Sequence, residues 1–189
     1  DERTVVAGGR RFEADYVVLA TGSRVNVPDL PGIEDVDYRT SADLLDATEL
    51  PDSAVAMGLG YVGLEMVPYL SEAGVDVTAV EHDDRPIDQV DPAVGRTVLE
   101  LYREAFDVTI PTECNECQVE ATADGGVRLH VEDADGSTDA IEAEELFLFT
   151  GRRPNVDGLG LGTAGIVPDA GYVEETMRAA AAGAGVLPG

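Results

Sequence analysis

Three glycines spaced for phosphate binding lie in the first third of the chain, in the run Gly58-Leu59-Gly60-Tyr61-Val62-Gly63. In this pattern the first glycine permits a tight turn, the second lets a pyrophosphate approach the backbone, and the third lets the following helix pack closely. The phosphates would then lie at a helix N-terminus, where free N–H groups and the helix dipole favour negative charge. The run therefore indicates dinucleotide binding; the alternative is a structural remnant that binds no nucleotide.

The elements that must position these glycines are also indicated by the sequence. Residues 54–57 predict a buried strand, residues 61–73 a helix closed by Gly74, and residues 75–80 the next strand, as in a strand-helix-strand unit with parallel strands. Pro68 lies inside this helix and should bend it or shift its hydrogen bonding. Glu81 follows the second strand, 18 positions after Gly63. That is close to the roughly 20 residues at which a carboxylate meets the adenosine ribose.

The carboxylate of Glu81 also predicts which dinucleotide binds. It can accept hydrogen bonds from the two ribose hydroxyls, and it repels the 2′-phosphate of NADP. Asp83 and Asp84 add negative charge, and the nearby cation, Arg85, is expected to pair with one of them. The predicted cofactor is therefore NAD.

The remaining pattern predicts an α/β fold, a parallel sheet with helices plus an antiparallel β-meander. Residues 91–106 predict an amphipathic helix, residues 108–110 a short strand, residues 116–142 three alternating strands, and residues 145–150 another apolar strand. At the start, residues 5–6 and 12–21 predict two strands joined by Gly8 and Gly9. A short helix is expected from Ser41, with Ser41 as its N-terminal cap.

Cys114 and Cys117 form a Cys-x-x-Cys pair, which occurs in redox and zinc sites. A zinc site needs four ligands, and the remaining candidates, His82 and His130, do not have finger spacing. A thioredoxin-type pair would precede a helix that lowers the thiol pKa, whereas these flanks alternate as a strand does. We therefore expect two structural cysteines, no metal site and no redox pair.

The composition excludes some classes of partner. The net charge is −26 at pH 7, and all 12 basic residues are arginine. This charge would repel nucleic acid, and no apolar run reaches the roughly 18 residues of a membrane span. Dense carboxylates without lysine are typical of proteins from a salt-loving cytoplasm; the alternative, an ordinary acidic interaction domain, leaves the missing lysine unexplained. The expected location is the cytoplasm.

Four motifs in order give the chain a wider resemblance. They are Ala20-Thr-Gly-Ser23, Gly58-Leu-Gly-Tyr-Val-Gly-Leu-Glu65, Val80-Glu81 and Thr150-Gly-Arg-Arg-Pro-Asn155. In this order they resemble the flavin-dependent pyridine nucleotide-disulfide oxidoreductases of the dihydrolipoamide dehydrogenase and mercuric reductase type, from about residue 3 to Tyr172. In that family an NAD-binding domain is inserted into the FAD-binding domain. The resemblance implies an end of a first FAD-domain segment at 1–35, an NAD-binding domain at 36–147 and the start of a second FAD-domain segment at 148–189.

The resemblance also implies roles for single residues on the NAD side. Tyr61 matches a position whose ring covers the flavin until nicotinamide displaces it, and Glu65 matches a carboxylate near the nicotinamide. The alternatives are a plain helix residue for Tyr61 and a solvated one for Glu65. Gly151 matches a backbone contact to NAD, and Cys117 falls near the strand position beside adenine.

The resemblance places FAD against a different set of residues. Thr21, Gly22 and Ser23 match a turn that lies against FAD, and Arg152 lies where flavin and nicotinamide meet. The family's first FAD motif, redox-active cysteine pair and lysine near the flavin would precede Asp1, and its dimer domain would follow Gly189. We therefore expect no catalytic residue in this chain, FAD only in a longer parent protein, and a parent that is a homodimer.

Three functions follow as expectations. The first is the NAD-binding portion of a dihydrolipoamide dehydrogenase-like enzyme, passing hydride between NAD and FAD. The second is the same portion of a mercuric or low-molecular-weight disulfide reductase. The third, from another class, is a stand-alone NAD-sensing Rossmann module, which would begin with the glycine strand and lack the segments on either side of it.

Overall fold

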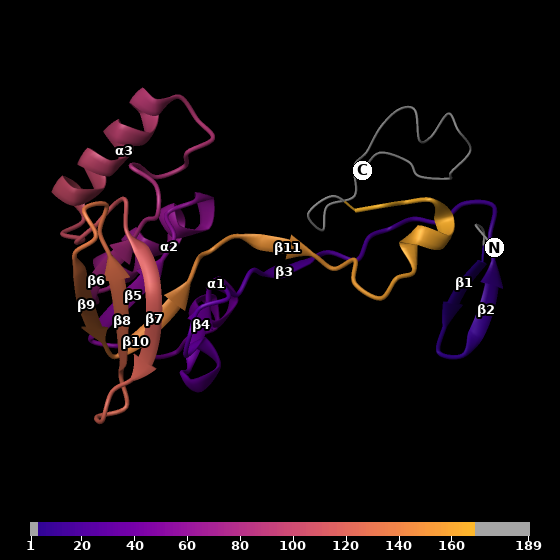
Figure 1. The fold of residues 1–189 in the computed structure, drawn as a ribbon, viewed down its shortest axis with the longest axis horizontal. Coiled ribbons are helices and arrows are strands. Elements are labelled where there is room, and N and C mark those ends of the chain that lie inside the picture. The colour runs from indigo at the N-terminus through magenta and orange to yellow at the C-terminus, as the bar shows by residue number, and fades with distance from the viewer. Residues whose placement is uncertain (1–3, 169–189) are drawn as a thin grey trace. The chain divides into compact units, whose positions relative to one another are not determined.

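The computed structural model describes residues 4–168. The chain divides into two compact units (Figure 1). One consists of Val25–Gly151, and the other combines Asp1–Arg24 with Arg152–Gly189, so the first is inserted into the second.

A four-stranded parallel sheet forms the centre of the inserted unit. Its strands are β4 (Tyr38–Thr40), β5 (Ser53–Met57), β6 (Asp76–Val80) and β10 (Glu145–Leu148), in the order β4-β10-β5-β6. All three pairings are parallel, and Thr109 extends the sheet through a single parallel bridge to Thr78. The predicted strand at 108–110 is therefore reduced to this one bridge. The strands β5 and β10 are apolar and buried because both faces of the sheet are covered.

Helices cover one face of this sheet. They are α2 (Tyr61–Glu72) and α3 (Pro92–Ala105), and α3 begins after Asp91, whose carboxylate accepts a hydrogen bond from the Ala93 N–H at 2.8 Å. Val67 and Leu70 of α2 and Leu99 of α3 share one core with Ala54 and Ala56 of β5. Both predicted helices are confirmed to within one residue at each end.

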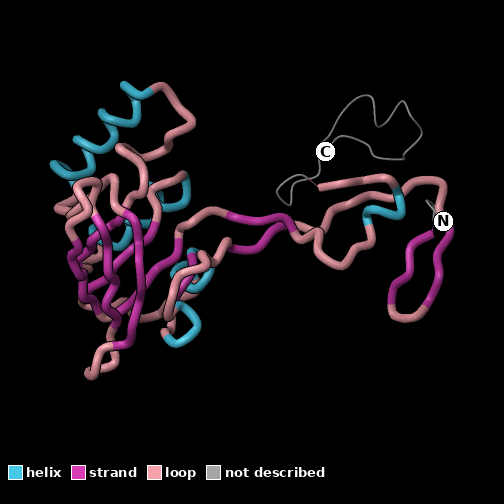
Figure 2. The backbone as a smooth tube through the Cα atoms, in the orientation of Figure 1, coloured by secondary structure: helices cyan, strands magenta, loops and turns pink. Residues whose placement is uncertain are grey.

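The antiparallel meander covers the other face. Its strands are β7 (Asn115–Ala121), β8 (Val127–Glu132) and β9 (Thr138–Ala143), in that order (Figure 2). Val127, Leu129 and Val131 of β8 pack in a second core with Val55 and Met57 of β5. Successive side chains of β5 thus face opposite layers, as the period of a strand requires. The predicted combination of parallel sheet, helices and meander is confirmed.

The short helix α1 (Ser41–Leu45) corrects the predicted cap. Its N-cap is Thr40, not Ser41, because the backbone of Thr40 is extended and the side chain of Asp43 lies three residues further on. The Thr40 N–H donates to Asp43 Oδ2 at 2.8 Å, and the Thr40 hydroxyl donates to the same oxygen at 2.6 Å. Together with the Thr40 side chain at the N3 amide, these contacts form a capping box.

The second unit contains a hairpin, in which β1 (Thr4–Ala7) pairs antiparallel with β2 (Arg10–Glu13). Gly8 and Gly9 both have positive φ, as a type I′ hairpin turn requires. The predicted second strand, residues 12–21, ends at Glu13 instead. Tyr16 and Val18 are 74% and 78% exposed, and no strand among residues 4–168 pairs with this segment. An apolar run forms a strand only where another strand supplies its hydrogen bonds.

Four short elements remain. β3 (Ser23–Val25) pairs with β11 (Arg152–Pro154), and 3-10 turns lie at Ile33–Asp35 and Leu161–Ala164. The part of the predicted segment 148–189 that follows residue 168 lies outside the described residues. No helix within residues 4–168 is long and apolar enough to cross a membrane.

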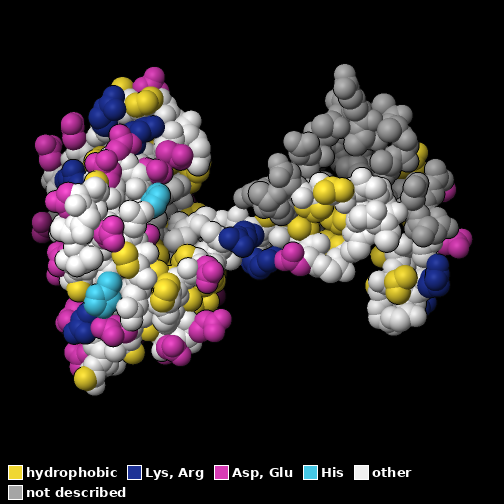
Figure 3. All heavy atoms as spheres, in the orientation of Figure 1, with side chains coloured by type: hydrophobic (Ala, Val, Ile, Leu, Met, Phe, Trp, Pro, Cys, Tyr) yellow, Lys and Arg dark blue, Asp and Glu magenta, His cyan; other side chains and the backbone are white. Residues whose placement is uncertain are grey.

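The acidic surface predicts salt-dependent stability. Asp and Glu side chains are scattered over the visible face of the inserted unit (Figure 3), in line with 38 acidic against 12 basic residues in the sequence. The Debye length falls from about 10 Å at 0.1 M salt to about 3 Å at 1 M, so repulsion between these charges weakens. We expect the Tm in thermal melts to rise between 0.1 M and 1 M sodium chloride. Sucrose, which stabilises without screening, is the control; a flat or falling Tm in salt would contradict this expectation.

Candidate functional site

The glycine turn connects the carboxyl end of β5 to α2, and two of its glycines are required by close contacts. Gly58 has φ +93°, and a Cβ there would lie 2.9 Å from the carbonyl oxygen of Phe149. A Cβ on Gly63 would collide with the carbonyl oxygen of Gly58. Gly63 therefore lets the first turn of α2 pack against the glycine turn itself.

Gly60 differs from these two glycines because no atom lies within 4 Å of the position of its missing Cβ. It is the N-cap of α2, with an extended backbone and no side-chain capping hydrogen bond. The first N–H groups of α2 therefore have no capping side chain, and an open space adjoins Gly60. This combination fits the binding of an anion at the helix N-terminus.

Glu81 lies beside this turn and is 8% exposed. Its Oε2 accepts a hydrogen bond from the Leu59 N–H at 2.7 Å, and its Oε1 accepts one from the Asp83 N–H at 3.1 Å. Burial raises the pKa of this carboxyl, opposed by the hydrogen bonds from Asp83 and Leu59. Glu81 is thus no solvated strand end; it joins β6 to the glycine turn and retains lone pairs for further donors.

The sequence did not indicate the two backbone groups that hold Glu81, those of Leu59 and Asp83. Leu59 has an apolar, fully buried side chain, and its contribution comes from its N–H. Backbone donors leave no trace in residue type, so only the spacing from Gly63 to Glu81 could suggest this contact.

Tyr61 and Glu65 lie on one exposed face at the start of α2. They are four positions apart, the separation that stacks side chains along a helix, and Tyr61 is 62% exposed. Val62, between them in sequence, is half-buried and packs against the core under the helices. The aromatic ring and the carboxylate can therefore meet the same ligand surface.

The two cysteines show no sign of a reactive thiol pair. Cys114 is buried just before β7, which starts at Asn115. Burial, followed by the hydrogen bond from its thiol to Asp133 Oδ1 at 3.1 Å, raises the pKa of Cys114 to about 11. Both cysteines are free, and Cys117 is exposed in β7 at a register irregularity. A thiol with this pKa is a poor nucleophile at neutral pH.

The start of β7 nevertheless approaches the end of β6. The Glu81 N–H donates to Pro111 O at 3.0 Å, the Cys114 N–H donates to Glu81 O at 3.3 Å, and the Glu113 N–H donates to Asp83 O at 3.0 Å. Residues 81–83 and 111–114 thus lie side by side. Cys117 follows three residues later, on the strand that leaves this edge. No group of three or more His, Cys, Asp or Glu in residues 4–168 could hold a metal ion.

Gly151 has φ +82° and open space at its Cβ position. Its carbonyl oxygen accepts a hydrogen bond from the Asn26 N–H at 3.0 Å, and the Thr150 hydroxyl donates to Asn26 O at 2.6 Å. Asn26 therefore anchors the backbone at Gly151 while leaving its outer side free.

The residues expected to contact FAD are brought together in the second unit. Arg152 Nε donates to Ser23 Oγ at 2.8 Å, and its Nη2 donates to Ser23 O at 2.7 Å. The Asn155 side chain donates to Thr21 O at 3.0 Å, and its N–H donates to Gly22 O at 2.9 Å. Asn155 thus fixes the turn from Thr21 to Ser23, a role that the sequence alone did not suggest.

Comparison with known families places the chain. Residues 1–181 match the family described as pyridine nucleotide-disulphide oxidoreductase. The chain belongs to this family. It is 32% identical over 167 residues to mercuric reductase of Bacillus cereus and 32% identical over 170 residues to dihydrolipoyl dehydrogenase of Rhizobium etli.

These oxidoreductases are considerably longer than the chain. The matches cover 88% of the chain and 26% of the mercuric reductase, and 89% of the chain and 34% of the dihydrolipoyl dehydrogenase. Among solved structures, the HOCl-induced flavoprotein disulfide reductase RclA from Escherichia coli superposes with a TM-score of 0.75 at 23% identity, covering 90% of this chain and 38% of that one. This likeness supports the fold.

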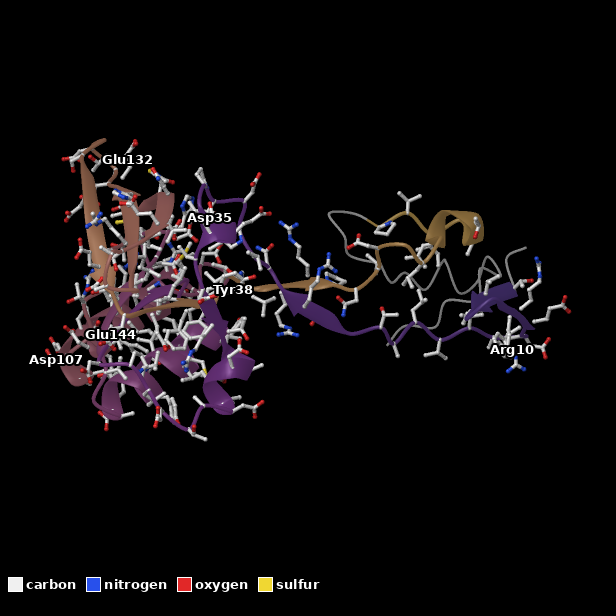
Figure 4. All side chains as sticks on the ribbon, turned by 90° about the horizontal axis from the view of Figure 1, so that it is seen from below. Arg10, Asp35, Tyr38, Asp107, Glu132 and Glu144 are labelled. Atoms are coloured by element: carbon white, nitrogen blue, oxygen red, sulfur yellow. The ribbon has the colours of Figure 1, made fainter. Side chains whose placement is uncertain are left out.

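The chain also has a cavity of about 680 Å³ at the end of the parallel sheet opposite the glycine turn. It lies at the amino ends of β4 and β10, and Figure 4 labels Asp35, Tyr38 and Glu144 from its lining. Six carboxylates and one arginine line it: Glu34, Asp35, Asp37, Asp43, Glu144 and Glu145, with Arg39. This charge repels phosphates, and ligands of open parallel sheets bind at the carboxyl ends of the strands. The cavity is not a candidate for the dinucleotide.

Proposed function

We propose that the inserted unit binds NAD at the carboxyl ends of β5 and β6, as part of a flavin-dependent disulfide oxidoreductase. The observation that carries the proposal is that Gly60 and Glu81 lie at the same turn. Gly60 leaves the N-terminus of α2 open and uncapped, and the buried carboxylate of Glu81 lies next to the same turn. An anion-binding helix end beside a hydroxyl acceptor suits a pyrophosphate joined to a ribose.

The chain's own residues would act by binding and orientation. The N–H groups from Gly60 to Gly63 would hold the pyrophosphate, Glu81 would accept from the ribose hydroxyls, and Tyr61 and Glu65 would border the nicotinamide. Gly151 would offer its open backbone. The start of β7, with Cys117, would lie near the adenine. When bound, NAD and FAD supply the hydride chemistry, and the protein holds their rings in place.

Charge around Glu81 favours NAD over NADP. Hydrogen bonds from the Leu59 and Asp83 N–H groups hold the Glu81 carboxylate in place, and a 2′-phosphate there would meet like charge from it and from Asp83. Arg85 forms a salt bridge with Asp84, and its Nη2 donates to Asp88 O at 3.2 Å. Its aliphatic part packs where a Cβ on Gly95 of α3 would sit. Arg85 is therefore engaged with its own loop instead of presenting a phosphate-binding fork.

The flanking residues would serve FAD in a longer protein. We propose that Thr21, Gly22, Ser23 and Arg152 lie against FAD there, with residues 1–35 and 148–189 in its FAD domain and 36–147 in its NAD domain. A dihydrolipoamide dehydrogenase-like cytoplasmic homodimer is the favoured parent, and a mercuric or low-molecular-weight disulfide reductase is the alternative. A salt-rich cytoplasm would explain the acidity.

Calorimetric titration in 1 M salt tests this function. We expect the chain to bind NAD with a measurable Kd and NADP at least about tenfold more weakly, because the two differ by a phosphate facing carboxylates. The absence of NAD binding by the folded chain would contradict the proposal, and tighter binding of NADP would contradict the role given to Glu81.

A further inference from the structure

Pro68 interrupts the hydrogen-bond ladder of α2 at one carbonyl group. In a helix the carbonyl of residue 64 accepts from the N–H of residue 68, and proline has no N–H. The proline ring also crowds the carbonyl oxygen four residues earlier, which is that of Leu64. This oxygen therefore needs a donor from outside the ladder.

The hydroxyl of Tyr102 supplies that donor. It donates to Leu64 O at 2.7 Å from α3, 38 residues away in the sequence. Tyr102 is itself held by an edge-to-face contact with Phe106, with ring centroids 5.2 Å apart. The Ser71 hydroxyl donates to Phe106 O and ties the other end of α2 to α3. Tyr102 is thus fixed between the two helices.

The bond acts on the peptide group that carries Glu65. The Leu64 carbonyl and the Glu65 N–H belong to one planar peptide, so holding the oxygen orients the Glu65 backbone. Burial raises the pKa of Tyr102, and the nearby negative charge of Glu65 raises it further. Tyr61 shares the exposed face of α2 with Glu65.

From this geometry we propose that Tyr102 is a positioning residue, which fixes the α2 peptide that carries Glu65 and so sets the nicotinamide half of the site. The proposal rests on the proposed function, since it concerns the same NAD site. It adds a residue on α3 that would contact no part of the ligand. It also gives Pro68 and Tyr102 a joint role, because Pro68 leaves the Leu64 carbonyl without a helical donor and the Tyr102 hydroxyl supplies one.

Four proteins test this proposal: the unchanged chain, Tyr102→Phe, Pro68→Ala and the double variant. The phenylalanine keeps the ring and removes the donor, while the alanine restores an N–H four residues after Leu64. Tyr69→Phe on the exposed side of α2 is the matched control. Urea unfolding checks that each variant folds, and calorimetry measures the Kd for NADH and for ADP-ribose, which lacks the nicotinamide.

We expect Tyr102→Phe to weaken NADH binding about fivefold, the effect of one hydrogen bond, and to leave ADP-ribose binding unchanged. The double variant Tyr102→Phe with Pro68→Ala should regain NADH binding, and Tyr69→Phe alone should have no effect. An equal loss for both ligands, no loss for either, or no rescue by Pro68→Ala would overturn the positioning role. If the unchanged chain binds neither ligand, the proposed function fails, and the positioning role fails with it.

Discussion

Replacing Gly63 by alanine is expected to destabilise the chain by about 3 kcal/mol and to abolish NAD binding. The new Cβ would meet the carbonyl oxygen of Gly58, a backbone atom that cannot move aside as a flexible side chain would. Relief requires α2 to move away from the glycine turn, and this separates its N-terminus from Glu81. Urea unfolding gives the loss of stability, and calorimetry gives the loss of binding.

Gly60→Ala is the matched control, because the two glycines lie three residues apart and differ in their surroundings. Gly60 has φ −68° and open space at its Cβ position. We expect the free energy of unfolding of the Gly60→Ala variant to differ from that of the unchanged chain by less than about 1 kcal/mol. NAD binding should fall by at least about tenfold, because the methyl group occupies the approach of the pyrophosphate. Unimpaired binding by folded Gly60→Ala would show that the open space receives no phosphate.

Glu81→Gln should remove most of the preference for NAD. Glutamine keeps an oxygen for the Leu59 N–H, so the turn retains its contact, but the charge that strengthens the bonds from the ribose hydroxyls is gone. We expect NAD affinity to fall by roughly 10- to 100-fold, the range for hydrogen bonds to a charged group. NADP affinity should fall less, because repulsion of its 2′-phosphate is relieved. Equal losses for NAD and NADP in calorimetry would contradict this assignment.

The same carboxylate gives NAD binding a pH dependence. Burial raises the pKa of Glu81, with His82, Asp83 and Glu116 as neighbouring ionisable groups. Hydroxyl donors favour the ionised carboxylate, so NAD affinity should decrease as the pH falls through this raised pKa. A raised folded-state pKa in an acid also means that the contribution of Glu81 to stability is lost as the pH rises. In Glu81→Gln the contribution of residue 81 to the pH dependence of NAD affinity and of stability should disappear.

Local patterns in the sequence predicted most of the inserted unit, although not the edge strand β4, which contributes three residues to the sheet. The apolar runs of β5 and β10 are buried on both faces, so burial agrees with local pattern and little depends on distant partners. The period-two alternation of β8 places Val127, Leu129 and Val131 in a core. Gly58, Gly60 and Gly63 followed from spacing: Gly58 and Gly63 occupy positions where a Cβ would meet backbone atoms, and Gly60 borders open space.

Contacts between distant residues could not be predicted in this way. The bond from Tyr102 to Leu64 joins residues 38 positions apart, and only the vacancy at Pro68 hinted that some donor was needed. The predicted strand through residue 21 was wrong because its apolar residues find no pairing partner in the described chain, a property of the environment and not of the segment. The cap of α1 moved to Thr40 because Asp43 completes a reciprocal pair that a single-residue preference does not reveal.

The central claim is that NAD binds between the glycine turn and Glu81, and amide chemical-shift mapping tests it most directly. The 15N-labelled chain is titrated with NAD in 1 M salt, and shifts are followed at Leu59, Gly60 and Asp83 and at Asp35, Tyr38 and Glu144 as the distant control. We expect saturable shifts at the first three amides and none at the three that line the acidic cavity. Shifts confined to the cavity, or none at Leu59 and Gly60 while calorimetry reports binding, would contradict it.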